Sequence, residues 1–360
     1  MRIALVYNQR KSSNSSTGDG ADDRYAEWDS EETIQAIARA LARRHDVSLV
    51  EADEDCFEKL RRNRPELVFN ISEGLNGSSR EAQVPAMLEL LEIPYTGSDP
   101  LTLSVCLEKS RAKEILSYHK VPNPAFQVVE TADQPVRVKL PCLVKPLYEG
   151  SSKGIFNDSL VRTRSELASA VRRIVDKYSE PALVEQFLPG REFTVALLGN
   201  GDEVRILPIV EVRFDTLPPG VNPIYSYEAK WVWDTTDKPL EIFECPANLS
   251  SELEERVRET CLRAYRVLRC RDWCRIDVRL DAKGNPHVIE LNPLPGIIPD
   301  PAANSCFPKA ARSAGLDYDD LILAVTDAAI ARVGLAKDAS RAAATQPSPS
   351  PRWPPAPPIA

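Results

Sequence analysis

The chain has 360 residues, with 45 Lys and Arg against 53 Asp and Glu, and a formal net charge of −8. This length exceeds one typical domain, so we expect two or three units with substantial cores. The acidic balance without a basic patch argues against a nucleic-acid partner, and no apolar stretch approaches the ~20 residues that would make a membrane span.

The first predicted strand is the apolar run at residues 3–7, which follows Met1 and Arg2 directly. Because no secretory leader precedes this strand, we expect a cytoplasmic protein. The eight cysteines agree with a reducing compartment, since none forms a C-x-x-C pair and most lie among apolar residues.

Strands and helices alternate over the first hundred residues. Ser30 is the expected cap of a helix with apolar residues at helical spacing, and further strands are expected at 47–50 and 67–70. This alternation predicts a doubly wound α/β domain at residues 1–100.

Two further units and a tail follow. A helix through Lys109 and a strand ending at Lys145 belong to a predicted central unit at residues 101–182, and a third unit covers 183–335. Residues 336–360 are rich in Ala, Ser and Pro, so we expect a disordered tail.

The loop at 149–154 has the sequence Glu-Gly-Ser-Ser-Lys-Gly. Its glycines allow backbone N–H groups to turn towards phosphate oxygens, and Ser151 and Ser152 add hydroxyl donors. Lys109 and Lys145 precede the loop and are candidate phosphate ligands. Alternatively, the loop is an ordinary surface turn and the lysines are surface charges.

Glu185 and Glu192 lie at the ends of two apolar runs. Carboxylates in such positions can accept hydrogen bonds from the sugar hydroxyls and base amine of a nucleotide. The alternative is a pair of solvated strand ends.

A β-hairpin is predicted around the turn at 281–285. Alternation places Glu290 and Asn292 on one face of a strand, and Asp277 can face them from its partner. Oxygen ligands among apolar residues indicate a Mg²⁺ site rather than an exposed polar face.

Arg275 shares a strand face with Asp277 and is either half of a structural ion pair or a stabiliser of developing negative charge. The backbone N–H of Gly296 is a second candidate donor to such an oxyanion. Lys230 is a candidate anion ligand. The sequence contains neither a G-x-S-x-G elbow nor a P-loop, which argues against a serine hydrolase and a P-loop nucleotidase.

Together these motifs resemble the ATP-grasp superfamily, and within it the D-alanine–D-alanine ligase family, over residues 1–330. The segments that carry the resemblance are 67–70, 93–98, Lys109, 145–146, 150–154, 185–198, 227–230, 275–278, 290–292 and 295–296. It implies an α/β fold of the α+β ATP-grasp type, in which an N-terminal doubly wound domain precedes two ATP-grasp subdomains that hold the nucleotide between them.

The resemblance also implies site residues. The ATP-binding set would be Lys109, Lys145, Glu149, Gly150, Ser151, Ser152, Glu185 and Glu192, with the loop at 149–154 as a lid. The ligands of two Mg²⁺ ions, or of Mn²⁺ in their place, would be Asp277, Glu290 and Asn292. The catalytic set would be Arg275, Gly296, Ser152 and Lys230, and the substrate-binding set Glu27 and Lys230.

The implied activity is peptide-bond formation through an acyl phosphate, with D-alanine and peptidoglycan synthesis as the family's setting and a homodimer as its usual assembly. Small amino acids would be the substrates. The alternatives are a ligase for other amino acids in a specialised pathway, an ATP-grasp enzyme that forms a carbamoyl or acyl phosphate for a different acceptor, and a nucleotide-binding protein without turnover.

The sequence departs from the family at its amino-acid subsites. The N-terminal Gly-Gly-x-Ser-x-Glu signature is not recognisable, and Glu27 is the candidate for its glutamate, which contacts the amine of the first substrate. The family's His-Gly is replaced by Glu73-Gly74, and residues 297–301 follow Gly296 where the family usually has a serine for the second substrate's carboxylate.

Overall fold

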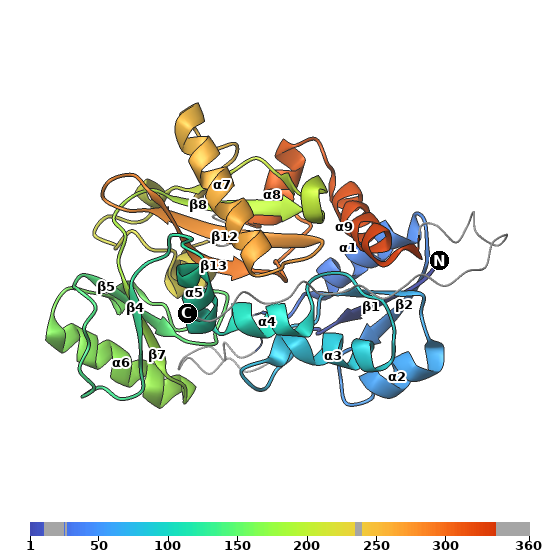
Figure 1. Cartoon of the computed structure of the whole chain (residues 1–360), viewed down its shortest axis with the longest axis horizontal. Helices are drawn as coiled ribbons and strands as arrows, with labels where there is room; N and C mark the ends of the chain where they lie inside the picture. Colours follow the sequence, from blue (N-terminus) through green and yellow to red (C-terminus); the bar gives the residue numbers. More distant parts are fainter. Residues whose placement is uncertain (11–24, 26, 235–239, 336–360) are drawn as a thin grey trace, which may run out of the picture.

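The computed structural model describes residues 1–10, 25, 27–234 and 240–335. The tail predicted at 336–360 lies outside the described residues. Three sheets follow one another along the chain, each with helices packed on it (Figure 1). None of the helices in the described part of the chain is long and apolar enough to cross a membrane.

The N-terminal sheet is parallel and has the strand order β2-β1-β3. Its strands are β1 (Arg2–Tyr7), β2 (Asp46–Glu51) and β3 (Leu67–Asn70), and its helices are α1 (Glu31–Ala42), α2 (Cys56–Asn63) and α3 (Gln83–Leu90). The predicted cap of α1 is confirmed, because the Ser30 hydroxyl accepts a hydrogen bond from the Thr33 N–H.

The central sheet is antiparallel and has the order β4-β7-β5-β6. Its strands are β4 (Phe126–Val129), β5 (Cys142–Pro146), β6 (Leu160–Val161) and β7 (Ala182–Gln186), and α6 (Arg164–Tyr178) packs against it. The predicted boundary between residues 182 and 183 places all but the first residue of β7 in the third unit. This boundary is wrong, because β7 pairs with β4 and β5, and an apolar run does not identify its partner strand.

The C-terminal sheet has the order β11-β10-β8-β12-β13, with β9 paired to β8. Its strands are β8 (Glu192–Leu198), β9 (Arg205–Ile206), β10 (Val210–Val212), β11 (Phe243–Glu244), β12 (Trp273–Leu280) and β13 (Pro286–Asn292). The predicted hairpin is confirmed, since β12 and β13 pair in antiparallel fashion.

Helices cover both faces of this sheet. One face buries α4 (Pro100–Leu107), α5 (Lys109–Tyr118) and α7 (Ser251–Val267), and the other buries α8 (Cys306–Ser313) and α9 (Tyr318–Val333). The helices α4 and α5 were expected in the central unit, but their apolar side chains pack into the core of the C-terminal sheet.

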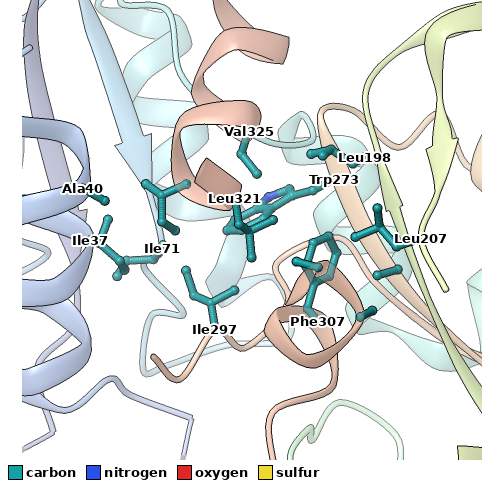
Figure 2. Packing of buried hydrophobic residues seen from close by; sticks show 14 of the residues in the cluster. Ile37, Ala40, Ile71, Leu198, Leu207, Trp273, Ile297, Phe307, Leu321 and Val325 are labelled. Atoms are coloured by element: carbon teal, nitrogen blue, oxygen red, sulfur yellow. The ribbon is translucent and has the colours of Figure 1, made fainter. Parts of the chain in front are cut away.

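The N-terminal and C-terminal sheets share one hydrophobic core. Trp273 of β12 lies between Phe69 of β3 and Phe307 of α8, with ring centroids 5.8 Å apart in both pairs. Side chains of α1 and α9 close the same cluster, which Figure 2 shows from nearby. The central sheet has a separate core with α6.

Candidate active site

One cleft gathers most of the predicted site residues. Its wall includes residues from β5, β8, β12 and β13, from the loop at 149–154, and from the segment around Lys230. The predicted residues in its lining are Lys145, Glu149, Gly150, Ser151, Ser152, Glu185, Glu192, Lys230, Arg275, Asp277, Glu290 and Gly296. Lys109, Asn292 and Glu27 lie outside this lining.

The hairpin brings the predicted metal ligands together. Asp277 is opposite Glu290 in the strand register, and Arg275 is opposite Asn292. The Asn292 side-chain amide donates to Asp277 Oδ2 at 3.3 Å, and the Thr194 hydroxyl donates to Oδ1 at 2.5 Å. Alternation along paired strands therefore places these side chains on one face of the sheet.

Two carboxylates and an amide oxygen fit a hard divalent cation. No group of three or more His, Cys, Asp or Glu side chains within the described ranges is arranged to hold a metal ion. Asp277 and Glu290 would supply only part of a coordination shell. The donor set therefore fits an ion that also binds the phosphates of a ligand.

Two cationic side chains, Arg275 and Lys230, line the cleft near the hairpin. Arg275 donates from Nε and Nη2 to Asp277, at 3.1 and 3.0 Å. Burial and the nearby Arg275 lower the pKa of Lys230 to about 8. Lys230 lies in a short π-helix (Ala229–Trp233), and its ammonium is 5.2 Å from the ring centroid of Trp231. This end of the cleft is therefore suited to anions.

A buried triad lies beside the cleft. Glu185 Oε1 is 2.8 Å from Lys145 Nζ, and Oε2 is 2.9 Å from Lys113 Nζ, with all three side chains 3% exposed or less. Burial would raise the pKa of Glu185, but the two ammonium groups outweigh it and lower the pKa to about 2. The triad carries one net positive charge towards the cleft.

Lys113 was not singled out as a site residue from the sequence. The available signal was its position one helical turn after Lys109, on the same face of α5. Lys109 itself donates from Nζ to the backbone oxygen of Glu149 at 2.6 Å and lies 3.7 Å from Glu290 Oε1. Its ammonium therefore connects the start of the loop at 149–154 with the hairpin.

Hydrogen bonds hold the loop at 149–154 in place. Ser151 and Ser152 have positive φ values of 52° and 61°, which are unfavourable for residues with a Cβ atom. The Ser152 hydroxyl donates to the Tyr225 carbonyl at 2.9 Å, and the Trp231 indole N–H donates to the Ser151 carbonyl at 3.1 Å. These bonds stabilise the strained conformation.

Glu27 fastens the loop from the N-terminal side. Its Oε1 accepts the Gly150 N–H at 3.0 Å, and its Oε2 accepts Arg80 and Lys153, both at 3.0 Å. Burial would raise the pKa of Glu27, but Arg80 and Lys153 lower it to about 2. Both oxygens accept hydrogen bonds from the protein, so Glu27 holds the loop at Gly150, and its contact with a substrate amine stays a prediction. Arg80 and Lys153 were not singled out from the sequence as site residues.

The segment after Gly296 contributes a serine that the sequence did not reveal. Ser305 lies in the cleft wall just before α8, donates to the Gly296 carbonyl at 3.3 Å and accepts the Ile298 N–H at 3.2 Å. Residues 297–301 do follow Gly296 directly, but the fold brings a serine from further along the chain to the same place. The residues between Gly296 and Ser305 form a loop that brings Ser305 back to Gly296. The sequence alone does not predict this contact.

Cys306 adjoins Ser305 at the first residue of α8 and also lines the cleft. Burial raises the pKa of its thiol to about 12. The group is therefore neutral at physiological pH and gives no thiolate nucleophile.

The family model described as "D-ala D-ala ligase C-terminus" matches residues 115–327. An uncharacterized protein of Sinorhizobium fredii, y4sG, is 34% identical over 91% of this chain and 97% of its own length. A D-alanine–D-alanine ligase of Bordetella pertussis is 35% identical over 80% of this chain and 86% of its own.

Solved structures support the same fold. The crystal structure of a D-alanine–D-alanine ligase from Bacillus anthracis complexed with ATP superposes with a TM-score of 0.69. The match covers 94% of this chain and 99% of the other at 22% identity, which is a likeness of fold.

Proposed function

This chain belongs to the D-alanine–D-alanine ligase family, and from that premise we propose that it is an ATP-dependent ligase that joins two amino acids. The carboxyl group of one substrate would form an amide bond with the amino group of the other. Small amino acids are the proposed substrates, with D-alanine first among them.

One observation carries the proposal: opposite charges meet in a single cleft in an order that suits ATP and a carboxylate. The cations Lys145, Arg275 and Lys230 line the same cleft as the carboxylates of Asp277 and Glu290. Apolar side chains also line the cleft, and we assign these as the slot for a flat base: Leu143, Phe187, Leu188, Ile224 and Ile289.

The reaction has two steps. The carboxylate of the first amino acid attacks the γ-phosphorus, and the bond from that phosphorus to the β,γ-bridging oxygen breaks. ADP is released, and the first amino acid becomes an acyl phosphate. The neutral amine of the second amino acid then attacks the acyl carbon. The tetrahedral oxyanion collapses with loss of inorganic phosphate, and the nitrogen gives up a proton.

We assign Arg275 and the N–H of Gly296 to the tetrahedral oxyanion. Donors held in place before charge develops lower the barrier, and loss of one such donor typically costs ~10²–10³ in rate. Asp277 keeps the guanidinium of Arg275 oriented through two hydrogen bonds. Lys145 would neutralise phosphate charge, and Lys230 would hold an anionic group of a substrate.

Asp277, Glu290 and Asn292 are the proposed Mg²⁺ ligands. Bound there, Mg²⁺ would neutralise charge on the phosphates during transfer. The protein's own part is positioning, since the hairpin fixes both carboxylates relative to Arg275.

The test is phosphate release from ATP and Mg²⁺ with a panel of D- and L-amino acids, supplied singly and in pairs, with products identified by mass spectrometry. Release with D-alanine alone, accompanied by the dipeptide, supports the family's reaction. Release with another amino acid keeps the ligase and changes its substrate. ATP binding without release for any substrate would contradict the proposal.

A further inference from the structure

Arg279 is a buried arginine in the cleft wall to which neither the sequence motifs nor the proposed reaction gives a role. It lies on β12 and is 5% exposed. Its guanidinium carbon lies 4.6 Å from the ring centroid of Phe187 and 4.9 Å from that of Phe214. Its Nη2 donates to the Pro223 carbonyl at 2.8 Å.

The remaining strong contact of Arg279 is to Glu192. The two residues are opposite each other in the register of β12 and β8, and Nη1 donates to Glu192 Oε2 at 2.8 Å. Burial raises the pKa of Glu192, and Arg279 opposes that rise. The ion pair therefore favours the charged form of a half-buried carboxylate and fixes its direction.

Glu192 differs from Glu185 in what it can offer a ligand. Both oxygens of Glu185 are occupied by lysine ammonium groups. Arg279 occupies only Oε2 of Glu192, and among the described residues no hydrogen bond to Oε1 is found. Glu192 is thus the carboxylate in this part of the cleft with an oxygen for a hydroxyl donor.

The surroundings indicate which hydroxyl that is. Phe187 and Leu188 belong to the apolar slot proposed for the base, and Glu192 begins the next strand. Phe187 lines this slot and also contacts the guanidinium of Arg279. A sugar attached to a base in the slot would extend from it towards Glu192.

We propose that Arg279 is a positioning residue that gives this protein its preference for ribose over deoxyribose nucleotides, by holding Glu192 Oε1 towards the sugar hydroxyls. The inference rests on the proposed function only in requiring that a nucleotide binds in this cleft. Arg279 itself need not touch the nucleotide.

The first test compares ATP with 2′-deoxy-ATP and 3′-deoxy-ATP in the wild type and in Arg279→Met. Methionine is unbranched, apolar and suited to the space between two aromatic rings, so the packing is conserved as far as possible. The wild type should prefer ATP over at least one deoxy analogue. In Arg279→Met that preference, measured as a ratio of kcat/KM values, should fall about tenfold, the size of one hydrogen bond to a charged group.

The dependence on pH separates this role from simple packing. Without Arg279 the charged groups facing Glu192 are Asp277, which disfavours its ionisation, and Lys145, which favours it. A carboxyl with a raised pKa is ionised only at higher pH. The preference of Arg279→Met for ATP should therefore increase more steeply from pH 6.5 to 9 than that of the wild type.

Two variants serve as controls. Arg213→Met removes an arginine whose ion pairs with Asp215 and Glu244 are largely exposed, and it should leave the preference unchanged. Arg279→Lys keeps a charge near Glu192 and should retain most of the preference. If Arg279→Met does not fold, a full preference for ATP in Arg279→Lys supports the role of the charge, and its complete loss contradicts it.

Direct titration calorimetry with the three nucleotides separates this inference from the proposed function. Suppose the protein binds ATP better than its deoxy analogues but shows no amino-acid-dependent turnover. This result would contradict the proposed ligase activity, and the binding preference of Arg279→Met would still decide the role of Arg279. An unchanged preference in Arg279→Met at every pH would overturn the inference. So would a wild type that binds all three nucleotides equally.

Discussion

Charged side chains in the cleft act in pairs and triads, so the effect of each depends on its neighbours. Arg275 is neutralised by Asp277, Lys109 lies near Glu290, and Glu185 is shared by two lysines. Lys230 differs, because the charge that affects its pKa most is that of another cation, Arg275.

Glu290 is expected to be indispensable for turnover but not for folding. It lines the cleft on β13, so Glu290→Ala removes a proposed Mg²⁺ ligand without opening a core. We expect loss of Mg²⁺-dependent phosphate release by a factor of at least ~10², with an unchanged melting temperature. Asp281→Ala, in the exposed hairpin turn, is the matched control, and wild-type activity in Glu290→Ala would contradict the metal assignment.

Lys230 should give the activity an alkaline limit. Its pKa of about 8 means that the ammonium is present below pH 8 and is lost above it. If Lys230 holds an anionic group, kcat/KM should fall as the pH rises through about 8. The attacking amine of a substrate changes in the opposite sense, because deprotonation makes it nucleophilic. Lys230→Arg, which stays charged, should move the limit to higher pH, and an unaltered profile in that variant would argue against the role.

At the level of elements, the loop at 149–154 is tied to two different parts of the chain. Glu27 and Arg80 approach it from the N-terminal domain, and Tyr225 with Trp231 approaches it from the other side. The loop is therefore held on both sides by contacts with distant parts of the chain. Gly150 lies directly against Glu27: a Cβ atom at this position would be 2.4 Å from Glu27 Oε1, so a side chain does not fit without a shift.

Gly150→Ala and Glu27→Ala should not be additive. The alanine methyl group collides with Glu27, so Gly150→Ala should displace the loop and lower kcat about tenfold or more, as a misplaced lid does. Glu27→Ala should lower activity by a similar factor, because the loop loses the hydrogen bond from the Gly150 N–H to Glu27. The double variant should be no worse than Glu27→Ala alone, since both changes break one contact. A product of the two separate effects would show that they act independently.

The β12–β13 hairpin shows what the sequence could predict. Its turn and its alternation are local, so the pairing of Asp277 with Glu290 was predictable. The partner of β7 and the return of Ser305 to Gly296 depend on contacts between distant residues, which one sequence does not report. Glu27 was predicted to lie at the site, but its ion pairs with Arg80 and Lys153 are visible only in the folded structure.

At the scale of the whole molecule, Asp272 connects three parts of the fold. Its buried carboxylate accepts the Gly97 N–H at 2.7 Å, the Asn200 amide at 2.8 Å, and Arg332 of α9 at 2.8 and 2.9 Å. It is fully buried and has a positive φ of 64°. These contacts join the N-terminal domain to the C-terminal sheet and its last helix.

Asp272→Ala should therefore destabilise the protein strongly. Removing one partner of a buried ion pair leaves Arg332 uncompensated, which typically costs ~3–5 kcal/mol of unfolding free energy. Denaturant unfolding monitored by tryptophan fluorescence would measure the loss. Asp319→Ala, from the exposed pair with Arg43, should cost under ~1 kcal/mol. A small effect of Asp272→Ala would contradict this role.

The shared core around Trp273 has a mechanical consequence. It joins the N-terminal and C-terminal sheets into one large unit, whereas the four-stranded central sheet forms a small unit with a core of its own (Figures 1 and 2). The chain connects the two units only through short segments on either side of residues 126–186. If this small unit moves relative to the large one, Lys145 and Glu185 move with it, because they lie on its strands β5 and β7. Reopening after such a movement would set an upper limit on turnover, however fast the bond is made.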